Sequence, residues 1–201
     1  MRQNPLQRRR GFTLTELLVV VLIIAVLTGL ILSISSYAHT KGQMARAQSE
    51  IAAMSAALES YKADNGMYPE NTATDTLNAR TNTSAEPVAS GTFSMGLYAA
   101  SSQYLYGQLS GDMSYDQQVT AGAKVYMMFP PRMLMTKGVA VGYIVDPFGF
   151  SYGYSTAYQG QVGAGKTPTE GYNPTYDLWS TAGKHVNMSG TAVEVTWITN
   201  W

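Results

Sequence analysis

The chain contains no cysteine, which excludes disulfide bonds, thiol catalysis and metal sites built from thiolates. Charged residues are also few, at 13%, while apolar residues make up 45% of the 201 positions. This length and composition suit one domain with an extension. We expect a core held together by packing alone and a largely neutral, polar surface, part of which the 14 tyrosines supply.

The chain after its N-terminal stretch has no excess of positive charge. Lys and Arg number 13, and so do Asp and Glu. Four of the basic residues are Arg2, Arg8, Arg9 and Arg10, in a stretch without an acid, so the rest of the chain has nine basic against thirteen acidic residues. Because nucleic-acid binding needs clustered Lys and Arg, we expect no nucleic-acid partner.

Proline is missing between Pro5 and Pro69, so one long helix is permitted there. From Leu17 to Ile34 the sequence reads LLVVVLIIAVLTGLILSI, without a charge. As a helix this run extends about 27 Å, against about 30 Å for the hydrocarbon core of a bilayer. We therefore predict a single membrane span at 17–34. By the positive-inside rule, the arginines before it keep the N-terminus in the cytoplasm and send the rest of the chain across the membrane.

Two ordinary export signals also fit parts of this N-terminus. Ser36-Tyr37-Ala38 has the small residues of a signal-peptide cleavage site, and the sequence RRGF at 9–12 resembles a twin-arginine signal. Neither explains Glu16, because a carboxylate costs several kcal/mol in a membrane when it is unpaired. Neither explains why a helical pattern continues beyond the apolar run.

The sequence RGFTLTELL at 10–18 resembles the processing site of type IV pilins and type II secretion pseudopilins. The resemblance implies that Arg8, Arg9 and Arg10 belong to a leader, residues 1–11, which a prepilin peptidase removes by cutting after Gly11. It also implies that an N-methyltransferase then methylates the new N-terminal residue, Phe12. Unlike an ordinary signal, the apolar helix stays attached to the mature chain.

Glu16 becomes the fifth residue of that mature chain, where the family places its glutamate. A free amine buried among apolar helices needs an opposite charge, and a carboxylate from a neighbouring copy supplies it. We predict that Glu16 pairs with the Phe12 amine of another copy and sets the register of assembly. The simpler alternative is a glutamate that lies at the level of the lipid headgroups.

The helical pattern continues beyond the span, so we predict one helix over residues 12–65. Apolar or small residues recur three and four positions apart, at Met44, Ala47, Ile51, Met54, Leu58 and Tyr61. The opposite face carries Arg46, Ser49, Glu50, Glu59 and Lys62. We expect the apolar face to pack on a sheet formed by the rest of the chain. The helix should end at Asn65-Gly66, and the sequence YKADNGMYP at 61–69 resembles the helix exit of the type II secretion major pseudopilin.

Residues 66–201 are expected to form a small periplasmic domain of the pilin-like α+β class, with an antiparallel sheet. Residues 70–92 read as a loop and 97–109 as a short helix. Strand-like runs follow at 124–129, 139–145, 151–157, 176–180 and 193–198. The sequences at 146–154 and 176–180 resemble the Asp-Pro-Trp-Gly turn and a late strand of the same pseudopilins. The segment 70–142 has no counterpart in this resemblance and is predicted to be a variable insertion.

The resemblance also implies a calcium site in the loop after residue 180. A hard cation needs several oxygen ligands, preferably charged ones. Residues 181–191 contain no Asp or Glu and include a lysine. We therefore predict no cofactor, and the remaining candidates for calcium ligands are Asp177, Asn187 and Glu194.

The sequence GQVGAGKT at 160–167 satisfies the P-loop pattern of nucleotide-binding proteins. A P-loop follows a buried apolar strand and opens a helix whose N-terminus holds the phosphates. Here Tyr, Ser and Gly precede the pattern, and Pro168, Gly171 and Pro174 follow it. We expect no nucleotide site.

These features predict a structural subunit of a type II secretion pseudopilus, located in the inner membrane before assembly, and not an enzyme. Copies would assemble through their N-terminal helices into a filament that acts in protein export. The partners implied are other pseudopilins, the two processing enzymes and an inner-membrane assembly platform. Two alternatives remain: a type IV pilin for adhesion, motility or DNA uptake, and a signal-anchored periplasmic binding module.

Overall fold

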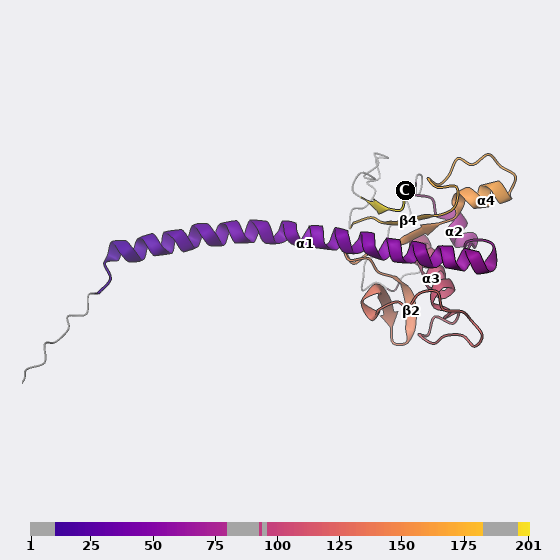
Figure 1. Cartoon of the computed structure of the whole chain (residues 1–201), viewed down its shortest axis with the longest axis horizontal. Coiled ribbons are helices and arrows are strands. Elements are labelled where there is room, and N and C mark those ends of the chain that lie inside the picture. The colour runs from indigo at the N-terminus through magenta and orange to yellow at the C-terminus, as the bar shows by residue number, and fades with distance from the viewer. Residues whose placement is uncertain (1–10, 80–92, 94–95, 183–196) are drawn as a thin grey trace, which may run out of the picture. The chain divides into compact units, whose positions relative to one another are not determined.

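The computed structural model describes residues 11–79, 93, 96–182 and 197–201, and within the first range it leaves out the side chains of residues 30–36. The chain divides into two compact units, Met1–Gly42 and Gln43–Trp201. The helix α1, Leu14–Asn65, is 52 residues long and contributes to both units (Figure 1). The α+β class predicted from the sequence is confirmed.

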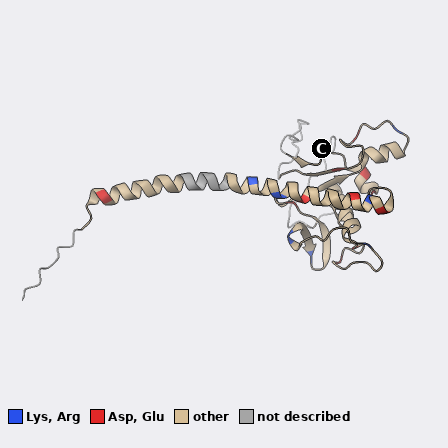
Figure 2. Ribbon diagram, viewed as in Figure 1, with Lys and Arg blue, Asp and Glu red and all other residues tan. Residues whose placement is uncertain are grey.

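In the first unit, the described part consists of residues 11–13 and the start of α1. Glu16 is the only charged residue of this helix before Lys41, and in Figure 2 the described residues between the two are tan. The hydroxyl of Thr28 donates to the carbonyl of Ile24 (2.7 Å), so this polar side chain is satisfied by its own helix. Among the described residues, no helical stretch combines the length and the apolar character needed to cross a membrane.

The end of α1 lies where the sequence predicts it. Gly66 has φ 79°, and its N–H donates to the carbonyl of Lys62 (2.8 Å). Glycine adopts this left-handed conformation without a steric penalty, which explains the stop. The Asn65 side chain also donates to the carbonyl of Tyr61 (2.9 Å) and so satisfies one of the last helical acceptors.

Within its described residues, the second unit contains short helices and two small antiparallel sheets. Its remaining helices are α2 (Thr72–Thr76), α3 (Leu97–Ser110), the 3₁₀ turn η1 (Pro131–Met133) and α4 (Ala157–Gly163). Its described strands are β1 (Leu134–Lys137), β2 (Ala140–Ile144), β3 (Gly153–Ser155), β4 (Asp177–Ser180) and β5 (Ile198–Thr199). β1 pairs with β2, and the other sheet has the order β3-β4-β5.

The last strand is held to β4 partly by a side chain. The amide of Asn200 accepts from the Leu178 N–H (2.8 Å) and donates to the Tyr176 carbonyl (3.2 Å). The Asn200 N–H also donates to the Leu178 carbonyl (3.1 Å). These bonds extend a pairing to which β5 contributes two residues in the described part of the chain.

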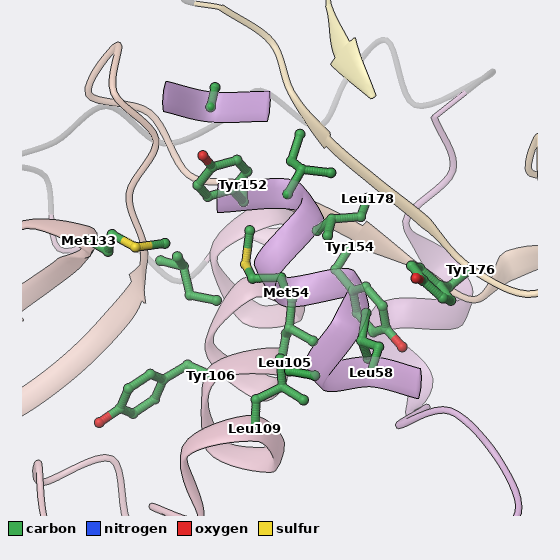
Figure 3. Packing of buried hydrophobic residues seen from close by; sticks show 14 of the residues in the cluster. Met54, Leu58, Leu105, Tyr106, Leu109, Met133, Tyr152, Tyr154, Tyr176 and Leu178 are labelled. Carbon is green, nitrogen blue, oxygen red and sulfur yellow. The ribbon is translucent and has the colours of Figure 1, made fainter. Parts of the chain in front are cut away.

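The main core lies between the second half of α1, α3 and the strands (Figure 3). The predicted apolar face of α1 is confirmed, because Ala47, Met54 and Leu58 are fully buried and Ile51 is 4% exposed. Opposite them lie Leu105 and Leu109 of α3, Tyr154 of β3 and Leu178 of β4, among others. Burial of apolar surface contributes about 25 cal/mol per Å², so this face stabilises the packing of the second half of α1 on the domain.

The prediction that Glu50 lies on the solvent-exposed face of α1 is wrong. Its position in the helical pattern puts it with Arg46 on the solvent side, yet it is 7% exposed. Its carboxylate accepts from the Tyr152 hydroxyl (2.8 Å) and pairs with Arg46 Nε (2.7 Å). Because both carboxylate oxygens have a donor, the group can be buried at an acceptable cost.

Three predictions of secondary structure were incomplete or wrong. The loop 70–92 contains α2 in its described part, and α4 and β1 were not expected. Residues 124–129 form no strand, because the N–H groups of Tyr126 and Met127 both donate to the carbonyl of Leu109. Residues 193–196 of the predicted strand 193–198 lie outside the described part of the chain, so the structure tests this prediction only at residues 197 and 198.

Candidate functional site

The predicted cleavage point lies in an exposed stretch that precedes α1. Gly11 has no atom within 4 Å of the place where a Cβ would lie, and Phe12 is 85% exposed. Neither residue is helical. No described part of the chain covers the peptide bond between them, so a protease can reach it. The leader arginines Arg8, Arg9 and Arg10 lie outside the described residues.

Thr13 and Glu16 form a reciprocal cap at the start of α1. The Glu16 N–H donates to Thr13 Oγ1 (3.3 Å), while the Thr13 N–H donates back to Glu16 Oε2 (2.8 Å). Thr13 Oγ1 also donates to the same carboxylate oxygen (2.8 Å). This is the capping-box arrangement, in which a threonine and a glutamate three positions on satisfy each other's N–H groups. Sequence reasoning assigned Glu16 to another copy and missed this bond within the chain.

The cap does not use all the acceptor positions of the Glu16 carboxylate. Both donors from Thr13 reach Oε2, and a carboxylate offers about four acceptor positions on its two oxygens. Glu16 also borders a shallow hollow that Phe12, Thr15, Val19 and Val20 line with it. The carboxylate can therefore keep its cap and still accept a hydrogen bond from a donor on another molecule.

The apolar side chains on both sides of Glu16 are uncovered in the single chain. They are 51% to 81% exposed, from Val19 and Val20 at the low end to Leu14 at the high end. The others of this group are Leu17, Leu18, Val21, Leu22, Ile23, Ile24, Val26 and Leu27. Soluble proteins rarely expose so continuous an apolar surface, and one of this extent marks contact with protein or with lipid.

The turn at residues 146–150 has a structural role, as expected for Asp next to proline. The Asp146 carboxylate accepts from the N–H groups of Phe148 (2.9 Å) and Phe150 (2.8 Å). Gly149 has φ 87°, and its N–H donates to the Asp146 carbonyl (3.0 Å). The turn also meets α1, because Gln43 Nε2 donates to the Pro147 carbonyl (2.8 Å).

The candidate calcium ligands are not brought together within the described part of the chain. Asp177 is 1% exposed, and its carboxylate accepts from the N–H groups of Tyr172 and Asn173 (2.8 Å each). Asn187 and Glu194 lie outside the described residues. Among the residues that are described, no three His, Cys, Asp or Glu side chains gather in a way that could hold a metal ion.

The P-loop-like sequence has the wrong local structure for phosphate binding. Gly160 and Gly163 lie inside α4, so a helix ends in the glycine-rich stretch where a P-loop would begin one. Packing explains the glycine at position 160 instead, because a Cβ there would lie 2.9 Å from Cγ of Asp75. Asp75 in turn accepts from the Thr156 hydroxyl (2.7 Å), and this contact joins α2 to the start of α4.

Comparison with known protein families assigns the N-terminal half of the chain. Residues 6–32 match the prokaryotic N-terminal methylation motif, and residues 36–113 match type II secretion system protein G. The second match extends into the segment 70–142, for which the sequence predicted no counterpart. The matches stop before residues 146–154 and 176–180, so the resemblance noted there stays a prediction.

Individual relatives carry the same name. The chain is 39% identical over 64 residues to type II secretion system core protein G of Klebsiella pneumoniae, which is 32% of this chain and 46% of the relative. It is 42% identical over 62 residues to the protein of that name from Escherichia coli K12, or 31% and 43% of the two chains. The corresponding protein of Pectobacterium carotovorum is 40% identical over 62 residues, or 31% and 40%.

The chain thus spans less than half the length of the curated relatives that it matches. No solved structure matches it at a significant level. The resemblance predicted from the residues is nevertheless confirmed where it was most specific, at the glycine-phenylalanine site and along the long helix. The chain therefore carries a match to the N-terminal methylation motif, followed by a match to type II secretion system protein G.

Proposed function

We propose that this protein is a structural subunit of a type II secretion pseudopilus and that it assembles through the first part of α1. The observation that carries the proposal is the exposed apolar surface from Leu14 to Leu27, directly behind the accessible Gly11–Phe12 bond. Burying one leucine or valine contributes about 1.5–3 kcal/mol. Packing this surface against other copies therefore supplies a large driving force and needs no catalytic group.

The remaining partners and the location follow from the same proposal. A prepilin peptidase cuts after Gly11, and an N-methyltransferase modifies the amine of Phe12. The run 17–34 holds the subunit in the inner membrane until assembly, with residues 66–201 in the periplasm. Other pseudopilins and an inner-membrane assembly platform complete the machine. Protein export is the role that the relatives' names support for the filament.

Glu16 has two tasks in this proposal. In the single chain its carboxylate caps α1 through Thr13. In the filament it also accepts the Phe12 amine of a neighbouring copy, since two acceptor oxygens allow both contacts. Charge neutralisation in a low-dielectric filament core is then worth more than it would be in water.

The direct test is coexpression of the full chain with a prepilin peptidase and the assembly platform. Mass spectrometry of the mature N-terminus should find methylated Phe12, and electron microscopy should find filaments. An intact leader, or cleavage between Ala38 and His39, would instead support a signal-anchored binding module. If filaments form but protein export is unaffected by deleting the gene, the subunit belongs to a pilus with another task.

A further inference from the structure

Two of the carboxylates that the second unit buries have no use in the proposed function and lie in one region of the domain. Glu50 of α1 is 7% exposed, and Asp146 at the start of the 146–150 turn is 3% exposed. A buried carboxylate is costly unless donors surround it. The donors of these two groups come from different parts of the domain, and together they connect α1, the turn and β4.

Asp146 fastens the turn to the end of β4. Its Oδ1 accepts the N–H groups of Phe148 and Phe150, and its Oδ2 accepts the hydroxyl of Ser180. The Ser180 oxygen accepts in turn from the Ala182 N–H (3.1 Å), where the chain leaves β4 with a positive φ of 52°. One carboxylate therefore joins two segments that lie more than thirty residues apart in the sequence.

Glu50 connects α1 to the same region. Tyr152, two residues beyond the turn, donates its hydroxyl to Glu50 Oε2, and Arg46 pairs with Oε1. The Tyr152 N–H donates to the carbonyl of Ile144 at the end of β2 (3.0 Å). The tyrosine thus spans from the helix to the chain on either side of the turn.

The charges in this cluster are not balanced. Asp146 and Glu50 are both acidic, and among the described residues the one cation bonded within the cluster, Arg46, pairs with Glu50. Burial raises the pKa of Asp146, and the Glu50 charge raises it further, while the bonds from Ser180, Phe150 and Phe148 oppose the rise without cancelling it. Burial and Glu50 likewise raise the pKa of Tyr152, which therefore stays a neutral donor.

We propose that Asp146 is a proton-sensitive lock between the 146–150 turn and β4, and that the domain holds its C-terminal strands more firmly when this carboxyl is protonated. The groups that face it are Glu50 with its partner Arg46 on α1, Tyr152 after the turn, and Ser180 on β4. The inference rests on the domain alone and goes beyond the proposed filament role. It means that a domain outside the membrane responds to the acidity of its medium.

The direction of the effect follows from linkage. A carboxyl whose pKa is higher in the folded than in the unfolded state binds its proton more tightly when folded. Its contribution to stability is fully present below the unfolded pKa and is lost as the pH rises through the folded pKa. Asp146 therefore opposes the usual loss of stability of proteins in acid.

Thermal unfolding of the full-length chain in detergent micelles tests the lock, with tryptophan fluorescence as the readout. Trp179 lies in β4 and Trp197 directly before β5, so the signal reports on the strands concerned. Asp146→Asn keeps an oxygen acceptor for the turn and removes the charge. We expect this variant to melt about 2–4 °C above the wild type at pH 8 and the difference to vanish toward pH 4.

Ser180→Ala supplies a second, independent measurement. It removes one donor and leaves the Asp146 charge in place, so it should lower the melting temperature at pH 8 more than at pH 4. A difference between Asp146→Asn and wild type that does not change with pH overturns the lock, and so does a variant that is less stable at every pH. If Asp146→Asn does not fold, a Ser180→Ala effect that is equal at both pH values overturns it.

Discussion

The ring of Trp179 in β4 covers Gly153, its partner in β3. A Cβ at position 153 would lie 2.3 Å from Cε2 of the indole, and the two residues stand opposite each other in the strand register. Trp179 is fully buried and donates its indole N–H to the Tyr98 hydroxyl (3.2 Å). It therefore has no room to move away, and glycine is required beneath it.

Gly153→Ala should consequently destabilise the domain by about 1–3 kcal/mol, the usual cost of overpacking a core. Chemical denaturation followed by tryptophan fluorescence measures the loss. Gly163→Ala is the matched control, because a Cβ at that position of α4 meets no atom within 4 Å. Equal effects of the two substitutions would show that Trp179 tolerates a side chain at 153.

Glu16→Gln separates the two tasks proposed for that residue. Glutamine at the third helical position also completes a capping box, so α1 should begin normally. The charge that neutralises a neighbour's amine is gone, and we expect filament formation to fall at least tenfold while processing at Gly11 continues. Electron microscopy and mass spectrometry report the two steps separately.

Thr13→Ala is the complementary variant, since it keeps the charge and removes the side-chain part of the cap. We expect a cost of about 0.5–2 kcal/mol to the first turn of the helix and filaments that still form. Normal filaments from Glu16→Gln together with none from Thr13→Ala would place the function in the cap and contradict the pairing.

Asp64 should respond to pH in the direction opposite to Asp146. The hydrogen bond from Lys124 is the main cause that lowers the pKa of Asp64, and this ion pair connects the end of α1 to the 111–129 segment. A lowered pKa adds stability above the unfolded value, and that stability is lost as the pH falls through the folded pKa. Asp64→Asn should therefore lower the melting temperature near neutral pH and have no effect in strong acid. The effect should be small and should weaken with salt, because the pair is exposed.

Removal of calcium should leave the melting temperature unchanged. Asp177 already accepts two backbone N–H groups, and residues 181–191 contain no acid. The measurement is thermal unfolding in excess calcium and then in excess chelator, with magnesium held constant. A melting temperature that falls in chelator would identify a site that includes residues outside the described part of the chain.

The sequence predicted best those features that depend on local chemistry. The C-terminal end of α1 follows from Gly66, and the apolar stripe of its second half follows from helical spacing. The helix at 97–110 ends at Gly111, which is left-handed as expected for a stop. In each case, neighbouring residues are enough to define the structure.

Apart from the local cap of Thr13 with Glu16, the features that sequence reasoning missed depend on distant residues. The helix α2 is five residues long and is stabilised by its Asn71 cap and by the contact of Thr74 with Thr156. Glu50 is buried because Tyr152 lies 102 positions away in the sequence and donates to it. Residues 124–129 have the composition of a strand, but the carbonyl of Leu109 takes the N–H groups that a ladder would use.

Asn200 gives the C-terminal strand an unusual kind of attachment. A strand of two residues has almost no ladder of its own, and a side-chain amide reaching Tyr176 and Leu178 substitutes for the missing rungs. Among the described residues, much of the attachment of residues 197–201 is thus concentrated at one position. Loss of this side-chain amide should therefore weaken the contacts that Trp197 and Trp201 make with the indole of Trp179.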